Sequence, residues 1–204
     1  PGILPAVISA RRSGITRVFV PLEARSEALL VPGIEVCAFA HLADFVQAFG
    51  GQAKRARVLG LVAQESVPKD AEEERTRIGG AGDFSQVRGH NSAIEAVAIA
   101  ASGGHHLMMI GEPGSGKTMM ASRLPSILPE LEQSDALTAS AIHSIAGDLS
   151  SGQLLTEPPF QAPHHSMSIP AMVGGGSGVI RPGAASLAHA GILFLDEATE
   201  FAPA

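Results

Sequence analysis

A glycine-rich segment near the middle of the chain restricts the fold more than any other part of the sequence. Residues 111–118 follow the pattern of Gly, four residues, Gly, Lys and Ser or Thr. This pattern works between a strand and a helix, because the loop leads from the edge of a sheet into a first helical turn. The apolar residues 106–110 predict that strand, and residues 119–128 predict that helix. The sequence therefore predicts an α/β fold with a parallel sheet flanked by helices.

The same segment predicts a site for the phosphates of a nucleoside triphosphate. Glycines let backbone N–H groups turn inward around a phosphate, and the following helix N-terminus adds partial positive charge. Lys117 is placed to reach the β- and γ-phosphate oxygens, and Thr118 to bind magnesium. The predicted nucleotide-binding residues are Gly111, Glu112, Pro113, Gly114, Ser115, Gly116, Lys117, Thr118 and Met119. The alternative, a glycine-rich turn that contains a lysine by coincidence, requires both the spacing and the flanking apolar run to be accidental.

A second segment supplies the acidic residues that such a loop needs. Residues 191–195 predict a buried apolar strand, and Asp196 and Glu197 follow it directly. Asp196 is expected to hold Mg²⁺ and Glu197 to polarise the attacking water. An apolar run ending in two acids also occurs as plain structure, but downstream of an intact phosphate loop it favours catalysis. Lys117, Asp196 and Glu197 are thus the predicted catalytic residues of an ATPase that uses ATP and Mg²⁺.

The chain divides into three predicted regions. Residues 1–51 alternate helix and strand patterns, with helices expected at 4–12, 23–30 and 41–49 and strands at 17–20 and 34–39. Residues 52–82 are rich in charge and glycine and predict a linker, with room for a short strand at 57–63. Residues 83–204 carry the phosphate loop, preceded by a helix expected at 92–101.

Composition narrows the class of protein. Hydrophobic residues make up 45% of the 204 residues, enough for a folded core. A single cysteine, Cys37, excludes an internal disulfide and favours the cytoplasm. The net charge of −6 argues against a globally basic nucleic-acid-binding surface. The longest uncharged run, residues 158–180, holds too many prolines and glycines for a spanning helix, so no membrane association is expected.

Histidines raise the hypothesis of a second metal site. The chain has 8, including the pairs His105 with His106 and His164 with His165. Adjacent residues on a strand point to opposite faces, so neither pair is expected to bind one ion without a turn, and no cysteine lies near. Magnesium bound with the nucleotide is the one metal expected, and the role of the histidine pairs is left open.

With these motifs in place, the chain resembles the AAA+ superfamily and, within it, the magnesium-chelatase-like family of ComM/YifB type. The resemblance is carried by residues 83–89, 103–106, 141–147, 159–165, 173–176 and 181–189. It implies an incomplete P-loop AAA+ core at residues 83–204, with Val87 and Arg88 as candidate contacts to the adenine. It also implies a homo-oligomeric ring, a hexamer in the full-length protein, in which residues 153–178 face the pore or a partner.

Residues 1–51 resemble the C-terminal half of the Lon-protease-like domain that precedes the ATPase in ComM-type proteins. Lon proteases carry a catalytic lysine in this segment, and residues 2–8 contain none. Without a general base a hydroxyl nucleophile stays unactivated. The segment is therefore interpreted as a non-proteolytic scaffold.

The resemblance implies an ATP-driven motor acting on DNA in recombination or natural transformation, by helicase or branch-migration work. Two alternatives stay open: an ATPase subunit that helps insert magnesium into a porphyrin, and a nucleotide-regulated protein-interaction module. The chain begins at Pro1 rather than Met and is expected to be a piece of a longer protein. The family's sensor strand, arginine finger and lid are expected after Glu200, so this chain alone is expected to bind nucleotide with little or no turnover.

Overall fold

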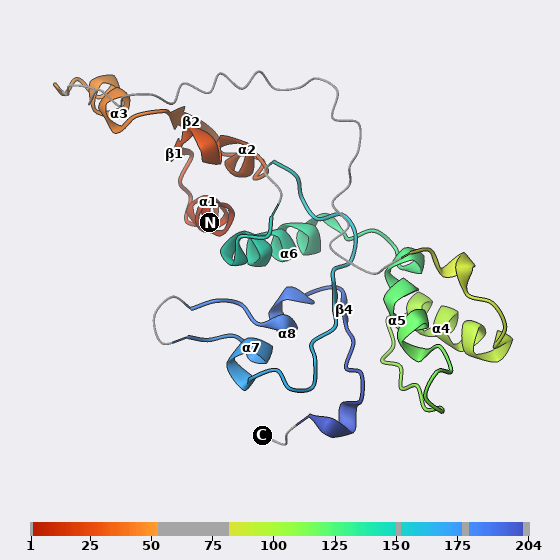
Figure 1. The fold of residues 1–204 in the computed structure, drawn as a ribbon. Coiled ribbons are helices and arrows are strands. Elements are labelled where there is room, and N and C mark those ends of the chain that lie inside the picture. Colours follow the sequence, from red (N-terminus) through yellow and green to blue (C-terminus); the bar gives the residue numbers. More distant parts are fainter. Residues whose placement is uncertain (1, 53–81, 150–151, 177–179, 202–204) are drawn as a thin grey trace. The chain divides into compact units, whose positions relative to one another are not determined.

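The structure, a computed structural model, describes residues 2–52, 82–149, 152–176 and 180–201. These residues divide into two compact units. The N-terminal unit consists of residues 3–52 with 152–153, and the loop-bearing unit consists of residue 2 with 82–149, 154–176 and 180–201. Figure 1 shows the order of their elements along the chain.

The N-terminal unit is a strand–helix–strand arrangement preceded and followed by a helix. Its elements are α1 (Ile3–Arg12), β1 (Arg17–Pro21), the short 3₁₀ helix η1 (Leu22–Ala24), α2 (Arg25–Ala28), β2 (Glu35–Phe39) and α3 (Leu42–Ala48). Strands β1 and β2 are parallel and in register from Arg17 opposite Glu35 to Pro21 opposite Phe39. Parallel neighbours need a crossover connection, which η1 and α2 provide.

A small apolar core holds this unit together. Leu4 and Val7 on α1 are buried with Ala28 at the end of α2 and Val31 just after it. The Leu4 backbone N–H also donates to the Glu27 carboxylate at 2.9 Å, which fixes the start of α1 against α2.

Charge and aromatic contacts join the two strands and α3. Arg17 donates to Glu35 at 2.7 Å across the strand pair; this hydrogen bond, with the charge of Glu35, raises the pKa of Arg17. Phe19 on β1 meets Phe45 and Phe49, whose ring centroids lie 5.2 Å from its own, so α3 and the residue after it pack on β1.

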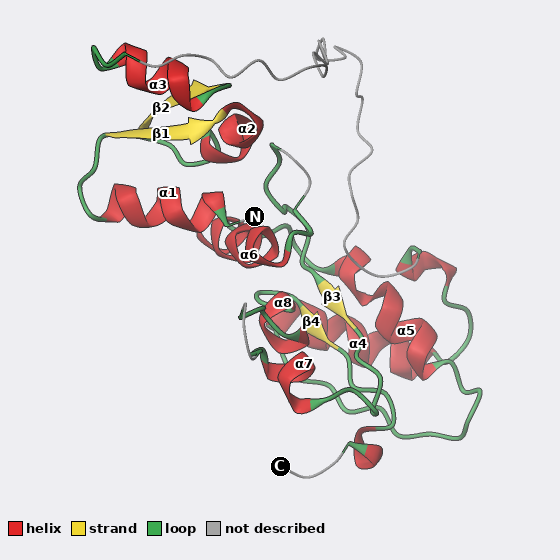
Figure 2. Ribbon diagram, turned by 60° about the vertical axis from the view of Figure 1, so that its left-hand side comes forward, coloured by secondary structure: helices red, strands yellow, loops and turns green. Residues whose placement is uncertain are grey.

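The loop-bearing unit is mainly helical with one short pair of strands. Its helices are η2 (Phe84–Gln86), α4 (Asn91–Gly103), α5 (Lys117–Arg123), η3 (Leu124–Ile127), α6 (Gln133–Ala146), α7 (Ile169–Val173), α8 (Ala184–Leu187) and η4 (Ala198–Glu200), and its strands are β3 (Phe160–Gln161) and β4 (Ile192–Leu193). Strands β3 and β4 are parallel, with Phe160 opposite Ile192 and Gln161 opposite Leu193. Figure 2 shows them side by side.

One core cluster of this unit lies directly behind the phosphate loop. Phe84, Val87, Val97 and Met120 are all buried in it, and they come from η2, the residue after it, α4 and α5. The Phe84 N–H donates to the Ser126 hydroxyl at 2.9 Å. The helix that follows the loop is therefore anchored to the segment that opens this unit.

A second core lies between α6 and α8. Ala139 and His143 of α6 are buried, as is Ala184 of α8, and His143 Nε2 lies 3.0 Å from the Leu187 carbonyl oxygen. This hydrogen bond ties α6 to the segment that leads into β4.

Most helices expected from the sequence are confirmed. The helix expected at residues 4–12 is α1, that at 92–101 is α4, and that at 41–49 is α3. The helix expected at 23–30 is divided between η1 and α2, and that at 119–128 between α5 and η3. The two strands expected in the first fifty residues are β1 and β2. The strand considered at 57–63 lies outside the described residues.

The strand expected at residues 106–110 is wrong. This segment has no regular structure, and Met108 and Ile110 are 83% and 86% exposed. An apolar run becomes a strand only where a neighbouring backbone accepts and donates its hydrogen bonds, and the described part of the chain offers this segment none. The strand expected at 191–195 is present but shorter, since β4 covers Ile192–Leu193 alone.

Candidate phosphate and magnesium site

The phosphate loop connects the irregular segment after α4 to the start of α5. Gly114 and Gly116 have φ angles of 80° and 84°, in the left-handed region that favours glycine. Gly116 stands immediately before α5, and the Met120 N–H donates to its carbonyl oxygen at 2.9 Å. The two glycines therefore let the chain turn tightly into the helix while leaving the loop without side chains at these points.

Lys117, the first residue of α5, folds back over the loop. Its ammonium group donates to the carbonyl oxygens of Gly111 and Glu112 at 2.8 and 2.9 Å and lies 3.4 Å from the Ser115 hydroxyl. An ammonium can exchange such oxygens for those of a phosphate, because both are hydrogen-bond acceptors. The lysine is thus held at the mouth of the loop with its charge pointing at the loop's own backbone.

Thr118 and Asp196 meet although 78 positions separate them. The Thr118 hydroxyl donates to Asp196 Oδ2 at 2.8 Å, which joins the first turn of α5 to the end of β4. Asp196 is partly buried. Two hard oxygen donors at hydrogen-bond distance fit the preference of Mg²⁺ for oxygen ligands. The structure brings together the two residues that the sequence predicts for magnesium.

Glu197 lies next to this pair in a constrained backbone conformation. Its φ is 51°, its N–H donates to Asp196 Oδ1 at 3.1 Å, and its carbonyl accepts from the Glu200 N–H at 2.8 Å. Its side chain is 68% exposed, and Oε2 lies 3.5 Å from His165 Nδ1. The carboxylate therefore stands open to solvent at the start of η4, beside a histidine.

The remaining predicted nucleotide contacts lie around the loop. Glu112 and Pro113 are exposed, and Met119 is 38% exposed with its methyl group near Gly116. Arg88 is exposed, whereas Val87 is 6% exposed and belongs to the core cluster behind α5. The structure thus packs the Val87 side chain into the core with Met120 of α5 and leaves Arg88 exposed.

His165 is the residue near this site that sequence reasoning missed. The pair His164 and His165 lies in a turn in which the Met167 N–H donates to the His164 carbonyl at 2.9 Å, and the two rings are 4.0 Å apart. The rule that adjacent residues point to opposite faces applies to strands, and the turn at this pair is the exception that the sequence analysis allowed. His165 follows Gln161 by four residues and Glu197 follows Leu193 by four, but this equal spacing has meaning only once the pairing of Gln161 with Leu193 is known.

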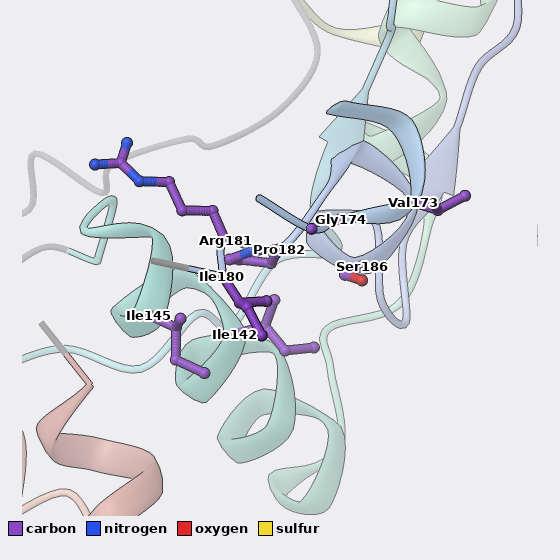
Figure 3. A pocket seen from close by; sticks show the side chains of 9 residues that line it. Ile142, Ile145, Val173, Gly174, Ile180, Arg181, Pro182 and Ser186 are labelled. Atoms are coloured by element: carbon purple, nitrogen blue, oxygen red, sulfur yellow. The ribbon is translucent and has the colours of Figure 1, made fainter. Parts of the chain in front are cut away.

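Another concave region lies away from these residues. An open pocket of about 470 Å³ is formed by α6, the end of α7, residues 174–175 and 180–182, and Ser186 of α8. In Figure 3, Ile142 of α6 lies beside Ile180 and Pro182, while the Arg181 side chain extends away from them. The pocket is lined by none of the predicted site residues and brings no acid, base or nucleophile to the loop.

None of the helices described is both long enough and apolar enough to cross a membrane. Within the same residues, no group of three or more His, Cys, Asp and Glu side chains is arranged to hold a metal ion.

A phosphate loop that opens a helix, linked by a threonine–aspartate hydrogen bond to the end of a parallel strand, defines an α/β fold of the P-loop AAA+ class. Residues 83–204 match the family model described as magnesium chelatase, subunit ChlI. The chain belongs to this family.

Curated relatives match almost the whole chain. Protein Rv2897c of Mycobacterium tuberculosis is 46% identical over 203 residues, which is 98% of this chain and 37% of that protein. Competence protein ComM of Haemophilus influenzae is 36% identical and YifB of Escherichia coli is 38% identical; each match covers 98% of this chain, with 38% and 37% of the relatives. The chain thus spans little more than a third of the length of these relatives and is ComM-like along nearly all of its own.

A shorter match concerns Lon proteases. A 54-residue part of the chain is 43% identical to archaeal Lon protease of Archaeoglobus fulgidus, which is 26% of this chain and 9% of that protein. This match supports the resemblance to Lon proteases over a part of the chain alone.

Proposed function

We propose that the protein is an ATP-binding and ATP-hydrolysing AAA+ motor of ComM type. The observation that carries this proposal is the 2.8 Å hydrogen bond from Thr118 to Asp196, because it joins the two halves of an ATPase site across 78 positions. A glycine-rich turn that held a lysine by coincidence would have no reason to meet an acidic residue at the end of the one parallel strand pair described in this unit.

Thr118 and Asp196 are the proposed ligands of Mg²⁺. Magnesium bound there would neutralise charge on the β- and γ-phosphates and hold them in place. The Thr118 hydroxyl oxygen and the Asp196 carboxylate would hold the ion, and the carboxylate would supply negative charge to it. The hydrogen bond between Thr118 and Asp196 keeps the two oxygens close together before an ion binds.

Lys117 and the loop are the proposed phosphate-binding group. Lys117 leaves the Gly111 and Glu112 carbonyl oxygens and donates to the phosphates instead, which are stronger acceptors because they are charged. The N–H groups of the loop and of the first turn of α5 donate as well. Val87 and Arg88 are proposed to border the adenine.

Glu197 is the proposed general base. Its carboxylate is 68% exposed and can therefore reach a water molecule, and it follows the magnesium ligand directly. A carboxylate that accepts a proton from water, or orients that water, accelerates such a reaction by about 100- to 10,000-fold.

Replacing Glu197 by Gln tests the ATPase. The variant keeps the size and polarity of the side chain but cannot accept a proton, so we expect nucleotide binding to persist and hydrolysis by the full-length protein to fall at least about 100-fold. Glu200→Gln, an exposed neighbour in η4, is the matched control and should hydrolyse normally. Unchanged hydrolysis in Glu197→Gln would contradict the proposal.

DNA is the proposed substrate, with a homo-oligomeric ring as the working form and the cytoplasm as its location. What supports DNA is the ComM resemblance and a relative whose name is competence protein. We expect forked or duplex DNA to stimulate hydrolysis by the full-length protein, with stimulation that falls as salt rises because phosphate contacts release counterions. Absence of any DNA effect at low salt would contradict the DNA assignment while leaving the ATPase intact.

The family model favours a second candidate, the motor subunit of a magnesium chelatase. In that case a porphyrin and its chelating partner, rather than DNA, should stimulate hydrolysis. If the protein is instead a nucleotide-regulated protein-interaction module, the biological activity of Glu197→Gln should survive although hydrolysis is lost.

A further inference from the structure

The strand pair β3 and β4 places His165 level with Glu197. Gln161 is opposite Leu193, and the Phe194 N–H donates to the Gln161 carbonyl oxygen at 2.8 Å, so the two segments leave the sheet in parallel and in the same register. The Phe160 and Phe194 rings stack beside this register, with centroids 6.2 Å apart. Four residues further along each segment stand His165 and Glu197, and Nδ1 of the histidine lies 3.5 Å from Oε2 of the glutamate.

The Glu197 carboxylate has little else to hold it. The backbone of Glu197 is fixed by its hydrogen bonds to Asp196 and Glu200. Its side chain, by contrast, is mostly exposed, and within the described residues His165 is the one basic side chain beside its carboxylate, with Nδ1 3.5 Å from Oε2. A carboxylate with one partner and open solvent around it samples several rotamers unless that partner selects one.

His165 itself is held by its neighbours. The His164 ring contacts it at 4.0 Å between ring centroids and tilted by 36°, and His164 Nδ1 lies 2.8 Å from the Ser166 hydroxyl. The turn that holds both histidines is closed by the hydrogen bond from Met167 to His164. The imidazole of His165 is only 33% exposed. It is therefore the better-ordered member of the pair and can fix the position of the other.

We propose that His165 is a positioning residue for the carboxylate of Glu197. The inference rests on the proposed function, in which Glu197 orients or deprotonates the attacking water. His165 acts through Glu197 and does not itself touch nucleotide: its Nδ1, 3.5 Å from Oε2, can donate a hydrogen bond to the carboxylate and so select the rotamer that lies beside Asp196. A half-exposed pair of this kind contributes little to folding, so its loss should be visible in activity rather than in stability.

The test compares two replacements of similar size in the full-length protein. His165→Leu removes the donor, and His165→Asn keeps an N–H near the position of Nδ1. We expect His165→Leu to lower kcat for ATP hydrolysis about tenfold, because a misplaced catalytic group costs rate without costing substrate binding. Its KM, its affinity for a fluorescent ATP analogue and its Tm should stay as in the parent protein. His165→Asn should recover most of the kcat.

His41→Asn is the matched control. His41 is an exposed histidine of the N-terminal unit, and its side chain makes no capping hydrogen bond to α3. This variant should hydrolyse ATP at the parent rate.

A combined variant separates failure of this inference from failure of the proposed function. In the Glu197→Gln background, His165→Leu should cause no further loss of the residual rate, because the two residues act as a unit. If Glu197→Gln hydrolyses normally, the proposed function itself is wrong. If Glu197→Gln is inactive but His165→Leu has the parent kcat, or if His165→Leu and His165→Asn lose rate, affinity and Tm together, the positioning role is wrong.

Discussion

Asp196 accepts two hydrogen bonds and is also the proposed ligand of a cation. It accepts a hydrogen bond from Thr118 through Oδ2 and one from the Glu197 N–H through Oδ1. An amide could keep the first of these contacts, since its oxygen is also an acceptor, but an amide carries no charge. The local fold and the binding of a cation therefore depend on different features of this residue.

Replacing Asp196 by Asn separates these features. We expect the variant to fold with little change in Tm, because the acceptor for Thr118 remains. The Mg²⁺ concentration that supports half-maximal nucleotide binding should rise at least about tenfold, because a charged ligand to a hard cation is lost. The measurement is a titration of nucleotide binding with Mg²⁺.

Asp148→Asn is the control for this charge change. Asp148 follows α6 and is not among the site residues. Its variant should need the same Mg²⁺ concentration as the parent. An Asp196→Asn protein with unaltered Mg²⁺ dependence would show that this carboxylate is not a ligand.

Sequence can point to single residues where one local motif defines them. The spacing of residues 111–118 and the acids after residues 191–195 led to Lys117, Thr118 and Asp196, and the structure places the last two within hydrogen-bond distance. His165 was missed because its position beside Glu197 depends on the register of two strands far apart in the chain. Register is set by packing and hydrogen bonding, which no short window of sequence contains.

Among the elements, the short pair β3 and β4 depends on a close approach of backbones. The Ile192 N–H donates to the Pro159 carbonyl oxygen at 2.8 Å. A Cβ at Gly191 would overlap that same carbonyl oxygen and the proline ring. The pairing that aligns Glu197 with His165 therefore needs a glycine at this position.

We expect Gly191→Ala to destabilise the protein by roughly 1–3 kcal/mol, the usual cost of forcing extra atoms into a packed site. The measurement is the free energy of unfolding from denaturant titration. Nucleotide hydrolysis should fall as well, because β4 delivers Asp196 and Glu197.

The neighbouring residue provides an opposite change as a control. Ala190 has a φ of 56°, which glycine adopts without strain. Ala190→Gly should therefore change the free energy of unfolding by less than about 1 kcal/mol, since relief of strain offsets the added freedom of the unfolded chain. Equal stability losses in both variants would show that the close approach at Gly191 does not matter.

Elements were predictable from sequence to the extent that they depend on local periodicity. Helices α1 and α4 follow from their apolar spacing and from the glycines that end them. The segment at residues 106–110 has a strand's composition yet pairs with nothing in the described chain, and Ile110 is 86% exposed. Strand-like composition indicates that a segment can form a strand, but the strand forms only where a neighbouring strand lies beside it.

For the whole molecule, the negative net charge does not favour the proposed DNA substrate. The net charge is −6, whereas a DNA motor presents basic residues to phosphates. The chain spans little more than a third of the length of its curated relatives. Its net charge therefore says nothing of the charge over the other two thirds of proteins of that length. The boundaries at residues 51, 82 and 83 stay a prediction; the family match nevertheless begins at residue 83.

The proposed ring makes a prediction that a monomeric ATPase does not. In ring ATPases a positive group from the neighbouring subunit stabilises the charge of the transition state, so each site needs an intact neighbour. A Glu197→Gln subunit keeps that positive group but cannot turn over its own nucleotide, so we expect it to stall the neighbours that depend on it. Mixtures of the parent protein with Glu197→Gln subunits, both at full length, should then lose more activity than dilution explains. With half the subunits inactive, less than half of the activity should remain. The measurement is steady-state ATP hydrolysis across mixing ratios at constant total protein, with His41→Asn subunits as the neutral partner. A strictly proportional loss would mean that each site works without its neighbour, which would contradict the ring.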